Sequence, residues 1–387
     1  MNRTSNCLAK LDRMNKTLQH EEADRVPISD FFWGSFLKRW RKDLNLPEDT
    51  DINKYYDLDW ISTTPNMDPH IKSFEILEEC DEYITVKTGF EAVIKKKFKD
   101  PMPAFLYFET DTIDKLTAFQ FDDPFDERRY FSSGDNQIAG VGDGFIRNTP
   151  AWIETVRTLY PDFPVYGSVC EGQEMLWRMI GSENVMLWML MFPDELDRFM
   201  DRLHQFIIGL TEAQIKAAGG MLDGMVLWGD VAYVRDLLFA PEEWRRFFKP
   251  IVKSVVDICR KHRLPVIYHG CGNTKRIFGE LIETGIDCYN PLECKAGMDV
   301  LELRKEFGHK IGFCGNLDVM IWANGSQEDI KKMVLTKLNA AKGGGYIVQS
   351  DHSVPSNISG QNYDYVVKLV REYGKYPLNL GEYDIPL

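Results

Sequence analysis

Short apolar runs alternate with longer amphipathic stretches along most of this chain. Eight such runs, each flanked by polar residues, Gly or Pro, lie at 25–32, 58–61, 165–169, 224–228, 265–268, 286–289, 311–314 and 346–348. Uniformly apolar runs of this length are typical of strands that are buried on both faces of a parallel sheet. The pattern therefore predicts an α/β protein rather than an antiparallel one.

The stretches between these runs carry hydrophobic residues at helical spacing. Residues 193–218 begin with Pro-Asp-Glu and residues 241–262 with Pro-Glu-Glu, both favourable first turns of a helix. Pro250 falls inside the second stretch and predicts a kink or a break there. Alternation over eight runs predicts a (β/α)8 TIM barrel formed by residues 1–387 as a single unit. A doubly wound open sheet is the alternative, weakened because no G-x-G-x-x-G follows the first run.

One region, at about residues 63–160, is too long for a single crossover between strands. Within it, residues 83–89 and 92–98 alternate as the two strands of a β-hairpin that turns near Thr88 and Gly89. We therefore expect a β-containing subdomain inserted after strand two. Insertions among the βα loops of a barrel often cover the active site, and we expect this one to do so.

Charge and composition exclude several classes of protein. The chain has 387 residues and a formal net charge of −13, which argues against a nucleic-acid or anionic-membrane binder. No uncharged run approaches the roughly 20 residues of a membrane span, and the polar N-terminal stretch is unlike a signal peptide. The eight Cys form no C-x-x-C pair, which indicates free thiols or ligands in a reducing cytosol. We therefore expect a cytoplasmic protein; homo-oligomer formation stays open.

The strongest local signal for chemistry follows the run at 265–268. His269 and Cys271 are two residues apart, so on an extended segment their side chains point to the same side. Imidazole and thiolate are both good zinc ligands. A buried His packed beside a buried Cys would give the same pattern, so the motif alone leaves both interpretations open.

Other strand ends carry further candidate ligands. In a barrel the carboxyl ends of all strands surround one cavity, so these residues would meet there. They are Asp230, Glu293 with Cys294, Cys314 with Asp318, and Asp351 with His352. Such clustering is unusual for packing alone because buried charges are rare without partners. Asp230 and Glu293 are also compatible with structural caps of loops, and Cys314 with a small buried residue.

Together these motifs resemble the uroporphyrinogen decarboxylase superfamily, whose fold is a (β/α)8 barrel. The resemblance is strongest between Trp228 and Tyr363 and loose in the predicted insertion. The motifs that carry it are Arg25-Val26-Pro27, Trp228-Gly229-Asp230, Phe239-Ala240-Pro241-Glu242, Tyr268-His269-Gly270-Cys271-Gly272, Cys314-Gly315-Asn316-Leu317-Asp318 and Asp351-His352-Ser353-Val354-Pro355.

Within the superfamily, the chain is more similar to the zinc- and corrinoid-dependent methyltransferases and O-demethylases than to true decarboxylases. Decarboxylases hold substrate carboxylates with an Arg-rich N-terminal stretch, whereas residues 29–36 here contain no Arg. The methyltransferases have a His-x-Cys zinc motif, which His269 and Cys271 match. Their third ligand is a Cys in the last strand's loop, where this chain has His352, as decarboxylases do. The resemblance thus implies zinc on His269, Cys271 and His352; Glu293, Asp351 or Cys314 could complete the site.

The activity implied is methyl transfer between a small methylated substrate and a corrinoid carried by a partner protein. Zinc would act as a Lewis acid, with Asp230, Glu293 and His352 as catalytic residues. A metal-free decarboxylase that uses Asp230 and His352, and a non-catalytic barrel that binds a tetrapyrrole or a corrinoid protein, are the alternatives.

Aromatic side chains near two strand ends indicate the kind of substrate. Phe32 ends the first run, Trp33 follows it, and Trp228 ends the fourth. If these rings line the pocket, they favour a flat, largely apolar substrate such as a methoxylated aromatic. Equally, they could only pack the insertion onto the barrel.

Overall fold

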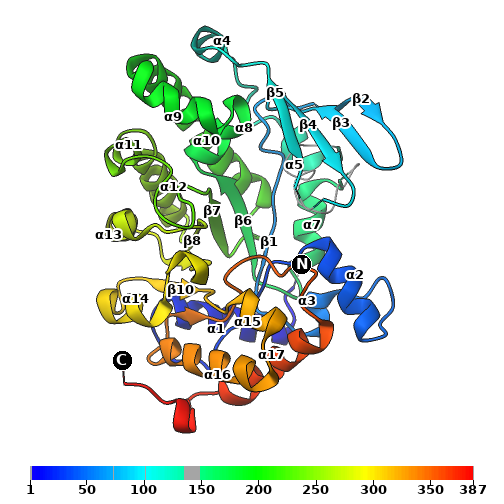
Figure 1. Ribbon diagram of the computed structural model, residues 1–387, viewed down its shortest axis with the longest axis vertical. Coiled ribbons are helices and arrows are strands. Elements are labelled where there is room, and N and C mark those ends of the chain that lie inside the picture. Colours follow the sequence, from blue (N-terminus) through cyan, green and yellow to red (C-terminus); the bar gives the residue numbers. More distant parts are fainter. Residues whose placement is uncertain (1, 73, 101, 135–148, 387) are drawn as a thin grey trace.

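The computed structural model describes residues 2–386 except 73, 101 and 135–148. Its main element is a parallel sheet of seven strands in the order β1-β6-β7-β8-β9-β10-β11. A separate antiparallel sheet has the order β2-β3-β4-β5 and lies at the upper right of Figure 1. The strands are β1 (Ile61–Ser62), β2 (Glu75–Glu79), β3 (Tyr83–Lys87), β4 (Ala92–Lys97), β5 (Ala104–Phe108), β6 (Val165–Cys170), β7 (Gly224–Trp228), β8 (Val266–His269), β9 (Cys288–Asn290), β10 (Gly312–Cys314) and β11 (Tyr346–Ile347).

Helices follow most of the parallel strands, as the alternating pattern predicts. Those before β7 are α1 (Ser5–Leu18), α2 (Gly34–Asp43), α3 (Ile52–Tyr55), α4 (Ile113–Ala118), α5 (Arg128–Phe131), α7 (Trp152–Leu159), α8 (Gly172–Ile180), α9 (Ser182–Met191) and α10 (Pro193–Ala218). Those after it are α11 (Pro241–Phe247), α12 (Lys249–Lys261), α13 (Lys275–Glu283), α14 (Val300–Phe307), α15 (Val319–Asn324), α16 (Gln327–Leu338) and α17 (Gly360–Tyr373), with short 3-10 turns at Cys294–Ala296, Asn339–Ala341 and Gly381–Tyr383. The break before Lys249 confirms the effect expected of Pro250. None of the described helices is both long and apolar enough to cross a bilayer.

The first apolar run, at 25–32, does not form the regular strand that its composition predicts. Pro27 has no N–H to donate, and the N–H of Ile28 donates to the buried carboxylate of Asp59 at 2.7 Å instead of to a neighbouring strand. The run still links both edges of the sheet. The Ile28 carbonyl accepts from the N–H of Asp59, next to β1, and the N–H of Val348, next to β11, donates to the Pro27 carbonyl. This segment therefore occupies the place of the eighth strand without its regular ladder.

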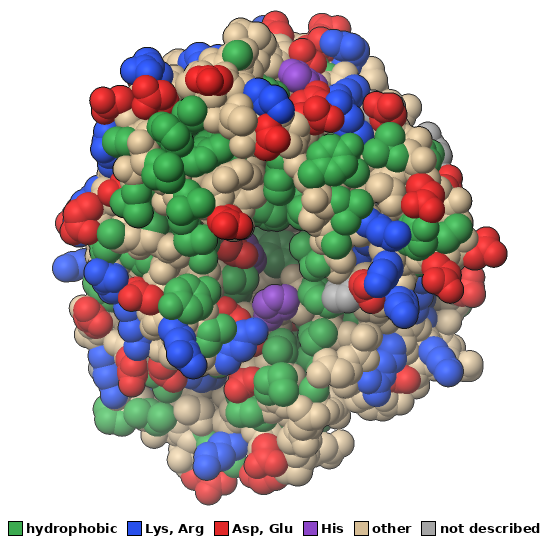
Figure 2. Space-filling model, turned by 45° about the horizontal axis from the view of Figure 1, so that its top comes forward, with side chains coloured by type: hydrophobic (Ala, Val, Ile, Leu, Met, Phe, Trp, Pro, Cys, Tyr) green, Lys and Arg blue, Asp and Glu red, His purple; other side chains and the backbone are tan. Residues whose placement is uncertain are grey.

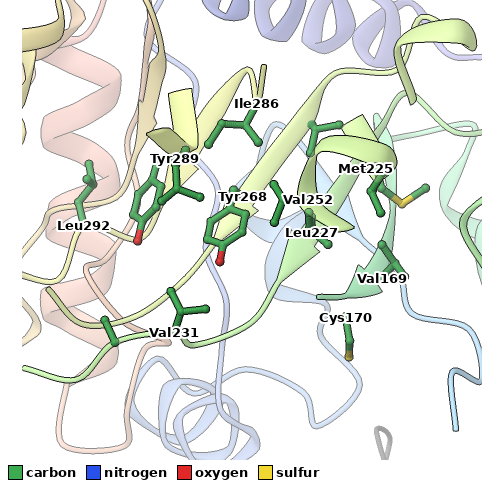
Figure 3. Close-up of a cluster of buried hydrophobic side chains, with 14 of the residues drawn as sticks. Val169, Cys170, Met225, Leu227, Val231, Val252, Tyr268, Ile286, Tyr289 and Leu292 are labelled. Carbon is green, nitrogen blue, oxygen red and sulfur yellow. The ribbon is translucent and has the colours of Figure 1, made fainter. Parts of the chain in front are cut away.

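The inner face of the parallel sheet carries a small hydrophobic core, separate from the main one. Each strand contributes one side chain, from within the strand or from just before it, and Met14 of α1 joins them. The members are Met14, Trp60, Tyr166, Val226, Ile267, Cys288, Cys314 and Ile347. Figure 3 shows the neighbouring cluster, in which Tyr268 of β8 and Tyr289 of β9 lie side by side with ring centroids 5.7 Å apart. Cys288 is thus a packing residue, and Cys314 is buried in the same layer.

The predicted hairpin is present as β3 and β4, extended on either side by β2 and β5. One face of this sheet carries a second small core of Phe74, Ile84, Val86 and Ile94, against which Phe105 packs. The ring of Phe105 also contacts Trp177 of α8 at 5.0 Å. The four-stranded sheet is therefore anchored to the helix that follows β6.

Candidate functional site

The side-chain alternation of the strands places a polar layer directly above the inner core. Ile267, Cys288 and Ile347 belong to that core, and side chains two residues further along a strand face the same way. The residues so placed are His269, Asn290 and Gln349. The next step in that alternation beyond His269 is Cys271. The sequence thus brings an imidazole and a thiol to the carboxyl end of β8, as predicted.

Three potential metal ligands converge at this point. The ligand atoms of Asp230, His269 and Cys271 all lie within 4.8 Å of one another. The Cys271 Sγ lies 3.9 Å from the His269 Nε2. Among the residues that the structure describes, this is the one group of three or more such side chains with that geometry. A nitrogen, a sulfur and an oxygen donor form a set that suits zinc, and three protein ligands leave an open position for a substrate.

The loop after β7 and the loop after β8 hold these ligands together through their backbones. The N–H of Cys271 donates to the Asp230 Oδ1 at 2.8 Å. Gly272 has φ +86°, and a Cβ on it would lie 2.6–2.8 Å from backbone atoms of Ala232 and Tyr233. The N–H of Asn273 also donates to the Tyr233 carbonyl at 2.9 Å. Only glycine fits where the two loops meet, so Asp230 and Cys271 keep a fixed spacing.

Electrostatics around these ligands favour a bound cation. Although Asp230 as a residue is exposed, its carboxylate loses solvation and faces the charge of Glu174, which together raise its pKa. Burial, followed by the charges of Asp230 and Glu293, raises the pKa of the Cys271 thiol well above its ordinary value. The thiol is therefore protonated at neutral pH in the metal-free protein, and a metal that binds it should release a proton.

Glu293 lies beside this group and supports it from the backbone side. Its Oε2 accepts the N–H of Gly272 at 2.8 Å, and its Oε1 pairs with the Lys295 Nζ at 2.8 Å. Both carboxylate oxygens thus have partners already. The structure places Glu293 next to the His-x-Cys loop but outside the group of three ligands.

His352 is also outside that group. Its Nδ1 lies 3.2 Å from the Ser353 carbonyl, and its ring contacts Trp33 with centroids 5.9 Å apart. Asp351, its neighbour, is buried, and its two oxygens accept the N–H groups of Cys294 and Val319 at 2.9 and 3.0 Å. Asp351 therefore ties the loops after β9 and β10 together.

The aromatic residues near the first run have different surroundings. Phe31 contacts the ring of His269 at 6.0 Å, edge to face. Phe32 instead packs against Phe36 and Tyr363, at 5.8 and 5.4 Å. Trp228 at the end of β7 lies 5.5 Å from the guanidinium of Arg178. Phe31, Trp33 and Trp228 are thus near candidate site residues, whereas Phe32 is partly buried and packs against the main core.

A second polar group lines the other flank of Asp230, at the start of α8. Glu171 is fully buried, its Oε1 accepts the N–H of Gln173 at 2.8 Å, and a Cβ on Gly229 would overlap its side chain. Burial and then the charge of Glu174 raise the pKa of Glu171 to about 8. Glu174 forms a buried ion pair with Arg178, 2.9 Å from its Nε. Sequence reasoning missed these three residues because, although Cys170 directly precedes them, Glu171, Glu174 and Arg178 form no recognisable ligand motif.

The face that contains these strand ends is hollowed. Figure 2 shows a depression near its middle, with His side chains in purple and apolar side chains in green around it. A separate cavity of about 640 Å³ lies between β1 and α7 and is lined by, among others, Thr63, Asn66, Arg128 and Trp152. None of the ligand residues lines that cavity, so it is distinct from the site described above.

Comparison with known proteins places the chain in a family. The sequence model of uroporphyrinogen decarboxylase (URO-D) matches residues 147–373, more than half of the chain. The chain belongs to the uroporphyrinogen decarboxylase family. The matched range of this family member includes Asp230, His269, Cys271, Glu293 and His352.

Curated relatives of this family member carry two different names. It is 24% identical to the uroporphyrinogen decarboxylase of Aeromonas salmonicida over 70% of its own length and 75% of the relative's. It is also 24% identical to the methylated-thiol–coenzyme M methyltransferase of Methanosarcina mazei, over 39% of its own length and 38% of the relative's. Among solved structures, a methyltransferase from Methanosarcina mazei superimposes with a TM-score of 0.61 at 15% identity, over 94% of this chain and 98% of the other. That likeness shows a shared fold.

Proposed function

We propose that this member of the uroporphyrinogen decarboxylase family is a zinc-dependent methyltransferase that moves a methyl group from a small methylated substrate to a corrinoid carried by a partner protein. The observation that carries the proposal is the convergence of Asp230, His269 and Cys271 within 4.8 Å. A decarboxylase needs no thiol ligand, whereas a metal-assisted transfer needs an N/S/O donor set with an open position.

The donor set fits zinc and defines what each residue would do. Zinc held there supplies Lewis acidity to the oxygen or sulfur that loses the methyl group. His269 and Cys271 are the ligands that the sequence predicted; Asp230, rather than His352 or Glu293, is the third that we now propose. Glu293 keeps the loop in place through the N–H of Gly272. We assign substrate contact to His352, whose ring contacts Trp33.

The residues around the ligand group favour a flat and weakly charged substrate. Phe31 lies edge-on to His269, and Trp33 lies beside His352, so an aromatic ring could pack between them. Arg178 and Lys295, two cations near the ligand group, are already paired with Glu174 and Glu293. They are therefore poorly suited to hold a polycarboxylate. A methoxylated aromatic, which loses its methyl group by O-demethylation, is the substrate that we favour.

The decisive experiment combines metal analysis with a methyl-transfer assay. Purified protein should hold about one zinc per chain and should methylate cob(I)alamin, measured by its visible spectrum, with one or more substrates from a panel of methoxyarenes, methanol, methylamines and methylated thiols. His269→Ala should lose zinc and activity together. His262→Ala, an exposed His on the far end of α12, is the matched control and should keep both.

Two results would contradict the proposal. Full methyl transfer by zinc-free protein would remove the metal from the mechanism. Release of CO2 from a carboxylated substrate without zinc would support the decarboxylase alternative, with Asp230 and His352 as acid and base.

A further inference from the structure

A chain of side-chain hydrogen bonds runs beneath the ligand group, from β8 across β9 to the end of β11. The His269 Nδ1 lies 2.5 Å from the Asn290 Oδ1. The Asn290 Nδ2 donates to the Cys314 carbonyl at 3.0 Å and to the Gln349 Oε1 at 2.5 Å. The Cys314 thiol donates to the same Gln349 oxygen at 2.8 Å. Asn290 and Gln349 are both almost completely buried.

The backbone carbonyl of Cys314 fixes the direction of every bond in this chain. A carbonyl only accepts, so the atom of Asn290 that faces it must be the amide nitrogen. The atom of Asn290 that faces His269 is then the amide oxygen, which also only accepts. The Nδ1 of His269 must therefore carry a proton, and in the neutral ring the Nε2 has the free lone pair. That nitrogen is the one that lies 3.9 Å from the Cys271 Sγ.

We infer that Asn290 is a positioning residue that holds His269 in its Nδ1–H tautomer, and that Gln349 in turn holds Asn290. The inference deepens the proposed function and rests on it for the identity of the metal ligand. A metal-binding His depends on such a partner because the partner sets both the tautomer and the orientation of the ring. Here the partner is a neutral amide oxygen rather than a carboxylate, and it orients the ring by accepting from the Nδ1–H.

The position of Gln349 explains why one amide is insufficient. The Asn290 side chain can rotate by half a turn and exchange its oxygen and nitrogen at little cost in shape. The Gln349 oxygen, which accepts from Asn290 and from the Cys314 thiol, would then face the Asn290 oxygen. That arrangement is repulsive, so Gln349 and the Cys314 carbonyl together exclude the flipped amide.

The first measurement is zinc affinity by competition with a chromophoric chelator. Asn290→Ala should weaken zinc binding about 10- to 100-fold. Gln349→Leu should weaken it less, about three- to tenfold, because the Cys314 carbonyl still orients Asn290. Gln214→Leu is the matched control: Gln214 is also buried, but it bonds to the backbone of Ser168 from α10. It should lower thermal stability and leave zinc affinity unchanged.

The second measurement reads the tautomer directly and needs no metal. In metal-free protein labelled with 15N-histidine, the His269 signals, assigned by their loss in His269→Gln, should show a protonated Nδ1. In Asn290→Ala they should shift toward the Nε2–H form. A wild-type His269 protonated on Nε2, or an Asn290→Ala protein with unchanged tautomer and unchanged zinc affinity, would overturn the inference. If the protein binds no zinc but shows the Nδ1–H tautomer, the proposed function fails and the tautomer assignment stands.

Discussion

The two sides of the hollow use the same residue types in opposite ways. On the β7–β8 side, Asp230, His269 and Cys271 direct their ligand atoms at one another. On the side of β11 and the first run, the carboxylates instead accept hydrogen bonds from other groups of the protein. Asp351 accepts two backbone N–H groups, and Asp30 accepts from the Ser350 hydroxyl at 2.5 Å. A position at a strand end thus does not make a carboxylate a ligand: both oxygens of Asp351 already accept backbone N–H groups, whereas Asp230 accepts one, from Cys271.

The largest effect is expected from the loss of a metal ligand on the β7–β8 side. Cys271→Ala removes one of three ligands and should weaken zinc binding roughly 100- to 1,000-fold, as measured by metal content after dialysis. Cys294→Ala is the control, since the Cys294 Sγ contacts the Asn316 carbonyl and not the ligand group. Equal zinc content in the two variants would mean that Cys271 is a packing residue.

The second effect concerns stability on the opposite side. Asp351→Ala leaves the buried N–H groups of Cys294 and Val319 without partners and should lower the free energy of unfolding by about 2–4 kcal/mol. Zinc affinity should stay within about twofold. Asp318→Ala, which removes only the cap of α15, should cost about 1 kcal/mol. Loss of zinc from the Asp351 variant would show that the two sides are not separate.

The third effect is a pH dependence of the stability that Asp30, on the same side, contributes to the fold. Burial raises the pKa of Asp30 to about 8, so the folded protein keeps a proton that the unfolded chain releases near pH 4. Wild-type stability from this group therefore falls as pH rises from about 4 to about 8. Asp30→Asn has no such proton to lose. The free energy of unfolding of the variant, minus that of wild type, should therefore increase with pH through that window, by about 1–3 kcal/mol at pH 8. Denaturant unfolding at pH 5, 6.5 and 8 measures this, and a constant difference between the proteins would contradict it.

The smallest effect tests whether the second side touches the substrate. Trp33→Ala should raise the KM for a methoxyarene about fivefold, the loss of about 1 kcal/mol of ring contact, with zinc content unchanged. Phe32→Ala should instead lower stability because Phe32 packs on Phe36 and Tyr363. Efficient use of methanol or methylamines with no activity on any methoxyarene would remove the aromatic pocket and leave methyl transfer intact.

The sequence predicted most of the parallel sheet because buried strands leave a strong local pattern. It located β7 at 224–228 and put His269 and Cys271 at the end of β8. The prediction of a regular strand at 25–32 was wrong. The irregularity of this segment depends on the Asp59 carboxylate, which binds Ile28 from 31 residues away. The outer strands β2 and β5 were missed because their side chains are largely exposed and their alternation is weak.

The candidate site was less accessible to such reasoning. Cys271 could be paired with His269 because spacing within one strand sets both side chains. Asp230 was named, but its closeness to them depends on the loop after β7, which has no periodic signal. The role of Asn290 requires knowledge of what faces it from two other strands, and the difference between Phe31 and Phe32 requires the phase of an irregular segment.

The close approach of Gly272 to Ala232 and Tyr233 limits how this site can be redesigned. Because backbone meets backbone there, any side chain at residue 272 would push apart the loops that carry Asp230 and Cys271. An engineer who wishes to change the metal or the donor set cannot graft one loop from a relative without the other. The two loops form one exchangeable cassette, and libraries that vary residues 229–233 and 270–273 should be built as linked pairs.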